Sequence, residues 1–347
     1  MSIPVYFATN RNKIESPVPN NFGTDFNVDG ALVFGRAVLK SVADESELGN
    51  SNLSIDALSP DDFSPTLRQA IVGQGADHLL IYLHGFDYRF RETVMRAGFL
   101  SDWYRRGKPS VASTIIAFSW PSLGSLNLDA YRTDYRNAAA SAGAFRRFLT
   151  RLLPLLQEYR AAKATRRVSL MAHSMGNHFL HAGLTAAIGT APGQFATASF
   201  AGLIDQLFLV ASDEDADALS SPGGLRWTPD IAGHVALYYN NQDIPLKTIS
   251  RPIHGVGRLG VDGPADKPSF RTRNISFINC SAANPELKPR SRQANPPRLD
   301  PQWHQYYRLV PEVRNDICGV MLGRDGAGLP NRTYRRTENF YRLDLAK

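Results

Sequence analysis

The sequence predicts an α/β fold, in which a mostly parallel, twisted sheet of about eight strands carries helices on both faces. Short β-rich runs alternate with longer helical patterns along the chain, as they do where helices connect parallel strands. Several of these runs, at residues 78–83, 114–120 and 205–210, are almost entirely apolar, which is typical of strands buried on both faces. A third observation is a tight turn of small residues that joins the run at 167–172 directly to a helical pattern.

Each run or pattern gives one expected element. The expected strands span residues 4–8, 31–39, 78–83, 113–119, 167–172, 206–211, 234–239 and 275–280. The expected helices span residues 91–105, 131–160, 175–188, 213–219 and 306–320.

Long stretches without either pattern remain, at 11–30 and 50–65 near the N-terminus and in two places later in the chain. Residues 247–273 and 284–302 are rich in glycine and proline, and loops of this length are usually functional lids or disordered segments. Both follow strands on the side of the predicted sheet where open α/β folds bind ligands. We therefore expect one domain over residues 1–347, with an N-terminal extension over about residues 1–70 and these two long loops.

The composition is that of a folded chain with a large core and a basic surface. Of 347 residues, 43% are apolar and 20% are charged, and the formal net charge is +7. The basic residues are scattered, and the densest group, at 288–298, is interleaved with prolines, so we expect no nucleic-acid partner. Cys280 and Cys318 have neither the number of a disulfide framework nor a metal-ligand spacing.

The N-terminus shows no charged region followed by a long apolar run, and no stretch approaches the roughly 18 apolar residues that span a bilayer. These features predict a cytoplasmic protein without integral membrane association. The sequence leaves the oligomeric state open.

Ser174 is the expected nucleophile. The pentapeptide Ala172-His173-Ser174-Met175-Gly176 leads from an apolar strand straight into a helix, which is the context of a nucleophile elbow. The residues two before and two after the serine must be small because the turn is tight, and they are alanine and glycine here. The N-terminus of the following helix then points at the serine, where its dipole favours developing negative charge.

Backbone amides of Phe86 and Met175 are expected to form an oxyanion hole. His84, Gly85 and Phe86 follow the apolar run at 78–83, and an amide from this loop acts together with the amide after the nucleophile in the α/β-hydrolase fold. Gly85 permits the close backbone approach that this geometry needs. His84 precedes the serine, whereas the chain order in this fold is serine, acid, histidine, so we expect His84 to order its loop rather than act as the base.

Two positions compete for the acid of a catalytic triad. Asp243 follows the run at 234–239, together with turn residues that can hold a carboxylate rigidly. Asp213, followed by Asp215 and Asp217, comes after the preceding strand, and such an acidic group is also typical of a helix start. We expect Asp243 to be the acid, and Asp213 stays the alternative.

The base is expected beyond the last strand. Only His254 and His304 follow Asp243. His254 lies before the final predicted strand, whereas His304 lies at the start of the last helical pattern, so His304 is the expected base. His178 and His181 are three residues apart on one predicted helix, but no other ligand-type residue is spaced with them, so we expect a structural role and no metal site.

These motifs resemble an uncharacterised esterase- or lipase-like family of bacterial α/β-hydrolases that is defined as a domain of unknown function. The resemblance covers nearly the whole chain and implies a hydrolase fold and a triad, but no substrate. A longer loop rich in proline and arginine before His304 departs from the family pattern. The matching motifs are FATNR (7–11), LVFGRA (32–37), YLHGF (82–86), FSWPSLG (118–124), Tyr131 with Asp134, AHSMGN (172–177), Asp213 with Asp215, NNQD (240–243), HQYY (304–307) and VRNDI (313–317).

We therefore expect a carboxylesterase-like serine hydrolase that acts on small-molecule esters through Ser174, His304 and Asp243, with no cofactor and no metal. A lipase, an amidase or an acyltransferase would use the same triad, and a non-catalytic interaction module would keep the same fold. Four aromatic residues near the motifs are candidates for lining an apolar substrate pocket: Trp120, Tyr131, Trp303 and Tyr307.

Overall fold

The computed structural model describes residues 2–15, 21–40, 53–73, 76–112, 114–189, 196–271, 273–283, 302–324 and 326–345. The expected loop at 284–302 therefore lies almost entirely outside the described residues.

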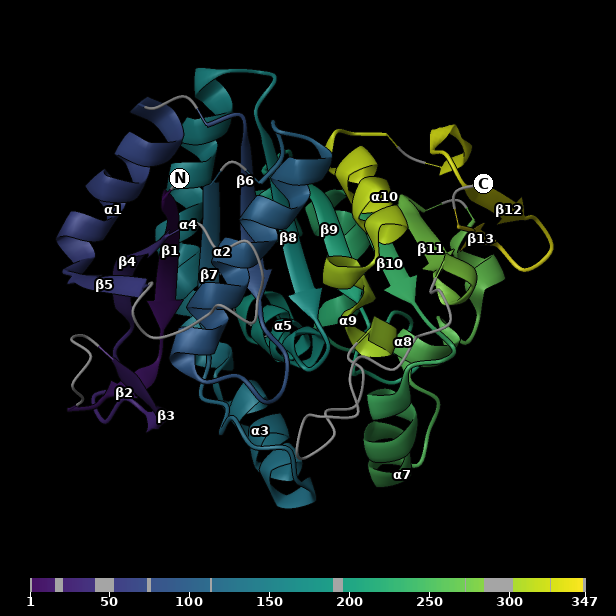
Figure 1. Ribbon diagram of the computed structural model, residues 1–347, viewed down its shortest axis with the longest axis horizontal. Helices are drawn as coiled ribbons and strands as arrows, with labels where there is room; N and C mark the ends of the chain where they lie inside the picture. Colours follow the sequence, from purple (N-terminus) through teal and green to yellow (C-terminus); the bar gives the residue numbers. More distant parts are fainter. Residues whose placement is uncertain are drawn as a thin grey trace.

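One large sheet runs through the molecule (Figure 1). Its strands are β1 (Ser2–Thr9), β4 (Val33–Lys40), β5 (Leu53–Leu58), β6 (His78–Leu83), β7 (Thr114–Ser119), β8 (Arg167–His173), β9 (Ile204–Val210), β10 (Ala232–Tyr239), β11 (Ile275–Asn279), β12 (Arg332–Arg335) and β13 (Phe340–Leu343). Two further strands, β2 (Arg11–Lys13) and β3 (Phe22–Phe26), form a separate ribbon.

The eleven strands are ordered β12-β13-β11-β10-β9-β8-β6-β7-β1-β4-β5. All neighbours from β13 to β1 in this order pair in parallel, whereas β12, β4 and β5 pair antiparallel at the two edges. The predicted fold class is confirmed, and the sheet is larger than the predicted eight strands. The strands β1, β4 and β5 of the expected N-terminal extension belong to this same sheet.

The strands that the sequence pattern missed are short or lie at an edge. In β5 buried and exposed residues alternate, and β12 is exposed over most of its length. Such strands contain no continuous apolar run, because only one of their faces meets the core.

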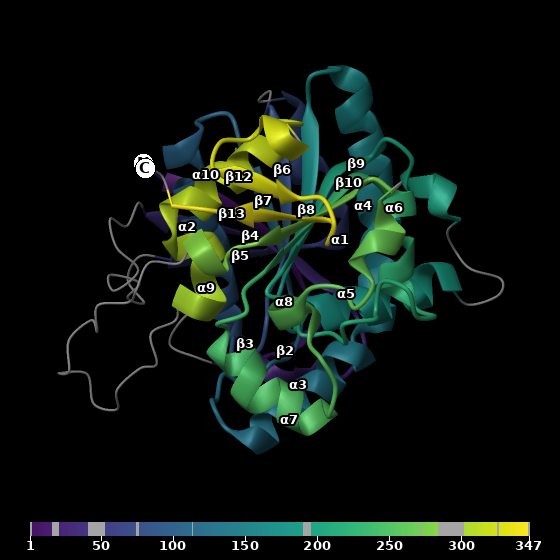
Figure 2. The same cartoon turned by 90° about the vertical axis from the view of Figure 1, so that its right-hand side faces the viewer.

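Helices cover both faces of the sheet. They are α1 (Pro60–Arg68), α2 (Phe90–Gly107), α3 (Leu128–Ala140), α4 (Ala142–Ala162), α5 (Gly176–Leu184), α6 (Thr228–Ile231), α7 (Arg251–His254), α8 (Leu259–Asp262), α9 (Gln302–Leu309) and α10 (Pro311–Met321). Figure 2 shows α2, α9 and α10 on one side of the sheet and α4, α5 and α6 on the other. Each face has its own core, because apolar side chains of these helices pack in two separate clusters.

Short π- or 3₁₀-helical turns complete the secondary structure of the described residues. They lie at Gln69–Gly73, Thr185–Gly189, Thr197–Phe200, Gly224–Trp227, Leu246–Ser250, Lys267–Phe270, Ser281–Ala283 and Gly326–Gly328.

Several expected elements differ from the structure. The helix expected at 131–160 is two helices, α3 and α4, which break at Ser141, where the side-chain hydroxyl donates to the Asn137 carbonyl. The helix expected at 306–320 breaks at Val310, because a residue before proline disfavours the helical conformation. The described residues of the expected loop at 247–273 contain several short helices and turns, at Leu246–Ser250, Arg251–His254, Leu259–Asp262 and Lys267–Phe270, rather than one irregular loop.

The helix expected at 213–219 is not formed. These residues make turns and an isolated β-bridge between Asp215 and Arg258. The carboxylates that were expected to start a helix instead pair with Arg258 from a distant segment, and this pairing fixes the local backbone.

Among the described residues, none of the helices combines the length and the apolar character that crossing a bilayer requires.

Candidate active site

Ser174 lies in the turn between β8 and α5, at the carboxyl end of the parallel strands. Its backbone has a φ of +54°, a left-handed conformation that is uncommon for residues other than glycine. The serine is 4% exposed. Gly176 lets the turn press against β6, because a Cβ there would lie 2.5 Å from the Leu83 carbonyl oxygen. The segment therefore has the geometry of a nucleophile elbow.

Hydrogen bonds hold the backbone of this turn. The Ser174 amide donates to the Val210 carbonyl over 3.0 Å, and the Asp213 amide donates to the Ser174 carbonyl over 3.2 Å. The side-chain amide of Asn177 donates to the carbonyls of Ala172 (3.1 Å) and Ser174 (3.0 Å). Asn177, the last residue of the AHSMGN motif, thus ties the strand end to the turn.

The ring of His304 lies between Ser174 and Asp243. Its Nε2 is 2.9 Å from Ser174 Oγ, and its Nδ1 is 2.7 Å from Asp243 Oδ2. These contacts fit a neutral imidazole whose Nδ1 donates to the carboxylate and whose Nε2 accepts from the hydroxyl. The structure thus brings together three residues that are far apart in the chain.

Asp243 is fully buried in the loop after β10. Its Oδ1 accepts from the Leu246 amide over 3.0 Å, which leaves Oδ2 aimed at His304. Asn240 in the same loop donates to the Trp303 carbonyl over 3.0 Å, so the loop is also tied to α9 beside His304. Burial raises the pKa of Asp243, and the nearby His304 opposes that rise.

His173, the residue before the nucleophile, holds the backbone of His304. Its Nε2 donates to the His304 carbonyl over 3.2 Å, and its ring packs against the rings of His304 and Tyr307. Burial lowers the pKa of His173 well below the ordinary value, so the imidazole is neutral at pH 7. His173 belongs to the AHSMGN motif, but nothing in the sequence indicated that its side chain contacts the His304 backbone.

The loop after β6 runs directly against the nucleophile. A Cβ at Gly85 would lie 2.8 Å from Ser174 Cβ and 3.0 Å from the His173 carbonyl oxygen. Met175 stands at the N-terminus of α5, and Phe86 follows Gly85. Among the backbone hydrogen bonds of the described residues, neither of these amides is a donor, so the prediction that both form an oxyanion hole stays a prediction.

A family model matches residues 59–287, more than half of the chain, and describes an alpha/beta hydrolase of unknown function (DUF900). The chain belongs to this family. The resemblance predicted from the sequence motifs is therefore confirmed.

Solved structures with similarity to this chain include acetyl xylan esterases. The catalytic core domain of the acetyl xylan esterase from Trichoderma reesei is 13% identical, with a TM-score of 0.34, and the match covers 72% of this chain and 97% of that chain. An iodinated complex of acetyl xylan esterase is 11% identical, with a TM-score of 0.33, over 72% of this chain and 99% of that chain. A search of curated proteins found no match.

Asp213 of the DUF900 hydrolase lies in a buried polar network and not against the base. Its Oδ1 is 2.7 Å from Nη2 of Arg258, and both side chains are fully buried. Tyr131 donates its hydroxyl to Oδ2 over 2.9 Å, and the Ser250 hydroxyl donates to Oδ1. Asp213, which follows β9, therefore forms a structural ion pair with Arg258. Its place after a buried strand had made it resemble Asp243 in the sequence.

The other two histidines considered as bases have partners elsewhere. His254 ends α7, and its Nε2 lies 3.0 Å from the Tyr131 hydroxyl. His84 is fully buried, stacks on Trp120 and donates from Nδ1 to the Gly85 carbonyl over 2.8 Å. Burial lowers the pKa of His84 to about 3, which fits a histidine that orders its loop.

Glu214 joins His178 and His181, a contact that the spacing of the sequence did not reveal. Its two oxygens lie 2.7 Å from His178 Nδ1 and 3.2 Å from His181 Nδ1. Burial alone would raise the pKa of Glu214, but the hydrogen bonds from the two histidines lower it to about 2. Among the described residues, no group of three or more metal-ligating side chains has a metal-binding arrangement.

The four candidate pocket aromatics differ in their surroundings. Trp120 and Tyr307 are fully buried core residues, and each directs its polar atom to a core partner, the His84 carbonyl and the Tyr82 hydroxyl. The expectation that these two line a pocket is wrong, because neither has exposed surface. Trp303 is half-buried beside His304, and Tyr131 borders a groove between α3 and α7.

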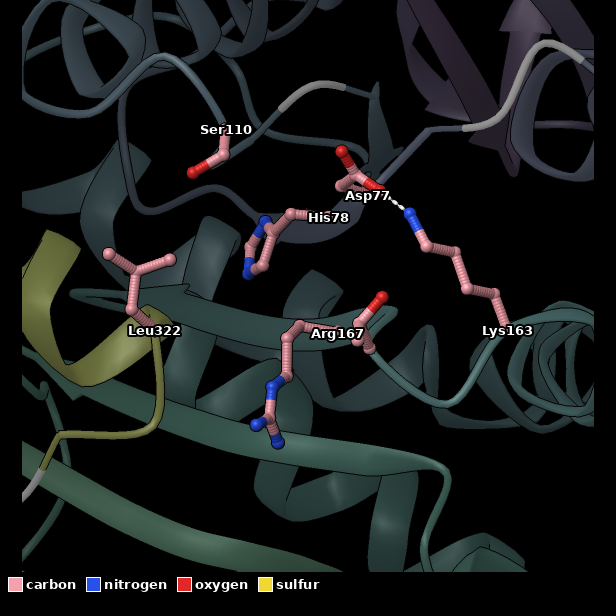
Figure 3. Close-up of a pocket in the computed structure, with 7 residues that line it drawn as sticks. Asp77, His78, Ser110, Lys163, Arg167 and Leu322 are labelled. Atoms are coloured by element: carbon pink, nitrogen blue, oxygen red, sulfur yellow. Dashed lines mark hydrogen bonds and ion pairs between the residues drawn. The ribbon is translucent and has the colours of Figure 1, made fainter.

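A separate hollow of about 350 Å³ lies at the opposite end of the strands, near the starts of β6 and β8 (Figure 3). Lys163 pairs with Asp77 over 2.9 Å, and Arg167 pairs with Asp205 over 3.1 Å. Its basic side chains are therefore neutralised within the protein, and the hollow lies at the wrong end of the sheet for Ser174.

Proposed function

We propose that this DUF900 hydrolase is a serine esterase that cleaves carboxylic esters through a covalent acyl-enzyme intermediate. The observation that carries the proposal is the position of His304, with Nε2 2.9 Å from Ser174 Oγ and Nδ1 2.7 Å from Asp243 Oδ2. A serine beside a base that is oriented by a buried carboxylate is the arrangement used for acyl transfer. Membership of an α/β-hydrolase family supports the same reaction class.

In the proposed first step, Ser174 Oγ attacks the carbonyl carbon of the ester. His304 Nε2 takes the hydroxyl proton, and the Asp243 carboxylate stabilises the resulting imidazolium. The carbonyl oxygen becomes an oxyanion that accepts hydrogen bonds from the amides of Phe86 and Met175, each worth on the order of 3 kcal/mol in the transition state. The N-terminus of α5 adds a favourable dipole.

The tetrahedral intermediate then loses the alcohol. The bond between the carbonyl carbon and the alkoxy oxygen breaks, and the alkoxide takes the proton from His304 Nε2, which leaves the acyl group on Ser174. Water next gives a proton to His304 and attacks the acyl carbon. Collapse of this second intermediate returns the proton to Ser174 Oγ and releases the carboxylic acid.

The test combines covalent labelling with turnover. The wild-type protein is expected to react with a fluorophosphonate probe and to hydrolyse p-nitrophenyl acetate, and Ser174→Ala should lose both activities while its melting temperature stays unchanged. Ser174→Ala removes a single hydroxyl oxygen from a turn outside the two apolar clusters, so it opens no sizeable cavity in the core. Ser220→Ala, at an exposed serine away from the elbow, is the matched control and should keep both activities.

Retention of more than a few per cent of turnover in a folded Ser174→Ala protein would overturn the proposal. An unlabelled, inactive wild-type protein would favour a non-catalytic module on the same fold.

A further inference from the structure

A groove of about 280 Å³ lies between α3 and α7, and its wall is mainly apolar. It is distinct from the hollow at the other end of the sheet, since both helices lie at the end of the molecule where the parallel strands finish (Figure 1). Six residues line it: Tyr131, Arg132, Tyr135, Arg136, Ile253 and His254.

The polar atoms at the inner end of the groove are already paired. The Tyr131 hydroxyl donates to Asp213 Oδ2 over 2.9 Å and also lies 3.0 Å from His254 Nε2. The ring of Tyr135 packs on the ring of His254 with centroids 4.6 Å apart. Arg132 and Arg136 also line the groove, and their guanidinium groups contact Asp129 and Thr133 of the same helix. The rest of the wall consists of ring faces and the Ile253 side chain, a mainly apolar surface that suits an apolar chain.

The inner end of the groove adjoins the candidate active site. The Tyr131 ring meets the Phe86 ring edge-on, with centroids 5.5 Å apart, and Phe86 is one of the two oxyanion donors in the proposed mechanism. Asp213, which holds the Tyr131 hydroxyl, also donates its amide to the Ser174 carbonyl over 3.2 Å. Tyr131 thus contacts both loops that flank the nucleophile.

The groove and His304 lie on opposite faces of the sheet. Tyr306 and Tyr307, beside His304 on α9, pack in the core under α2 and α10, whereas Tyr131 packs in the core under α4 and α5 (Figure 2). The leaving alcohol must face His304 Nε2, from which it receives its proton. An acyl chain that extends away from His304 would run to the side of the sheet on which the groove lies.

Two exposed apolar side chains belong to the same two segments as the groove. Leu128 on α3 recurs with the groove residues Tyr131, Arg132 and Tyr135 at the spacing of one helical face and is 52% exposed. Val256, two residues after α7, is 46% exposed. Exposed apolar side chains of this kind are typical of sites that bind an apolar ligand.

We infer that the α3–α7 groove binds the acyl chain of a medium-chain carboxylic ester. This inference rests on the proposed function, which sets the direction of the leaving group. The groove volume of about 280 Å³ lies just below the range of drug-sized ligand sites, which begins at about 300 Å³, so the groove suits one chain of medium length. Each methylene that it buries should improve binding about fourfold.

The test fills the groove and compares two substrates. Wild-type kcat/KM should be higher for p-nitrophenyl octanoate than for p-nitrophenyl acetate. Ile253→Trp places a bulky ring in the groove, so the octanoate-to-acetate ratio of kcat/KM should fall about tenfold or more, mainly through KM. Val28→Trp, at a 95% exposed position outside the groove, is the control and should leave the ratio unchanged.

An equal loss of kcat/KM for both esters, or an unchanged ratio in a folded Ile253→Trp protein, would overturn the acyl-chain assignment.

A second measurement tests the acyl-chain assignment separately from the proposed function. Binding of methyl octanoate to Ser174→Ala protein, measured by calorimetry, should weaken about tenfold or more when Ile253→Trp is added. If binding behaves so while the wild type hydrolyses no ester, the esterase proposal fails and the groove assignment stands. If Ser174→Ala binds no methyl octanoate, the groove assignment fails.

Discussion

At the scale of single residues, the orientation of His304 depends on three contacts from two separate segments, the loop after β10 and the end of β8. Asp243 accepts from its Nδ1, His173 donates to its carbonyl, and Asn240 holds the carbonyl of the neighbouring Trp303. A base that accepts a serine proton at Nε2 must carry its own proton on Nδ1. The buried carboxylate favours that tautomer, and the two backbone contacts keep the ring beside Ser174.

Asp243→Asn tests the role of the carboxylate. The asparagine keeps the shape but can donate its amide to Nδ1, which would favour the wrong tautomer. We expect kcat for an activated ester to fall by up to about 10⁴-fold, with little change in the circular dichroism spectrum. Stopped-flow or steady-state kinetics with p-nitrophenyl esters would measure the loss.

Asp213→Asn is the matched comparison. Its carboxylate pairs with the buried Arg258, so this variant should lower the free energy of unfolding by roughly 3 kcal/mol and reduce kcat of the folded protein far less than Asp243→Asn. A larger kcat loss in Asp213→Asn than in Asp243→Asn would move the acid to Asp213.

At the scale of elements, the elbow between β8 and α5 and the loop after β6 pack backbone against backbone. Gly176 and Gly85 make this contact possible, because a Cβ at either would lie within 3.0 Å of neighbouring atoms. The same contact sets how close the Phe86 amide comes to Ser174, whereas the Met175 amide is fixed by the chain itself. In the proposed mechanism the two elements must therefore fit closely for the nucleophile and both oxyanion donors to act on one carbonyl group.

Gly85→Ala should separate these elements. The new methyl group would meet Ser174 Cβ at 2.8 Å, so either the serine or the loop must move by part of an ångström. We expect kcat/KM to fall on the order of 10²-fold or more, as misplacement of about 1 Å can cause, with a smaller change in melting temperature. Gly143→Ala in α4, where a Cβ would meet nothing closer than 3.7 Å, should leave activity intact. Full activity of Gly85→Ala would show that the loop does not position the oxyanion donors.

At the scale of the whole molecule, three buried histidines in different parts of the fold are held neutral. Burial lowers the pKa of His78 and of His84 to about 3, and that of His173 well below its ordinary value. In the unfolded chain these groups titrate near pH 6.5. Between these values the unfolded state binds more protons than the folded state, so the free energy of unfolding must fall as the pH falls below about 6.5.

We expect the free energy of unfolding to be lower at pH 5.5 than at pH 6.5 by about 3 kcal/mol, roughly 1 kcal/mol for each histidine.

His181 affects the stability in a different pH range. Burial would lower its pKa, but Glu214 raises it, so its stabilisation is complete below about pH 6.5 and is lost at higher pH. Urea unfolding at several pH values would give the curve, and a higher stability at pH 5.5 than at pH 6.5 would contradict the prediction.

The sequence by itself determined the fold class, the position of the elbow and the loop that lies against it. These features depend on local order in the chain: apolar runs that form buried parallel strands, and small residues that only a tight turn requires. The edge strands β5 and β12 and the short strand β13 beside β12 escaped detection, because their pairing partners rather than an apolar run define them. The helix predicted at 213–219 does not form. Its acidic residues are typical of a helix start, but two of them form ion pairs with the distant Arg258 instead.

Only the tertiary structure decided which carboxylate meets His304 and where the groove lies. Asp213 and Asp243 both follow buried strands, and β9 and β10 are neighbours in the sheet, so chain order alone left both open. The answer depends on the face from which α9 approaches Ser174 and on Arg258, which neutralises Asp213 inside the core. Both are contacts between segments that are far apart in the chain. Such contacts arise from packing in three dimensions, and a local sequence pattern carries no information about them.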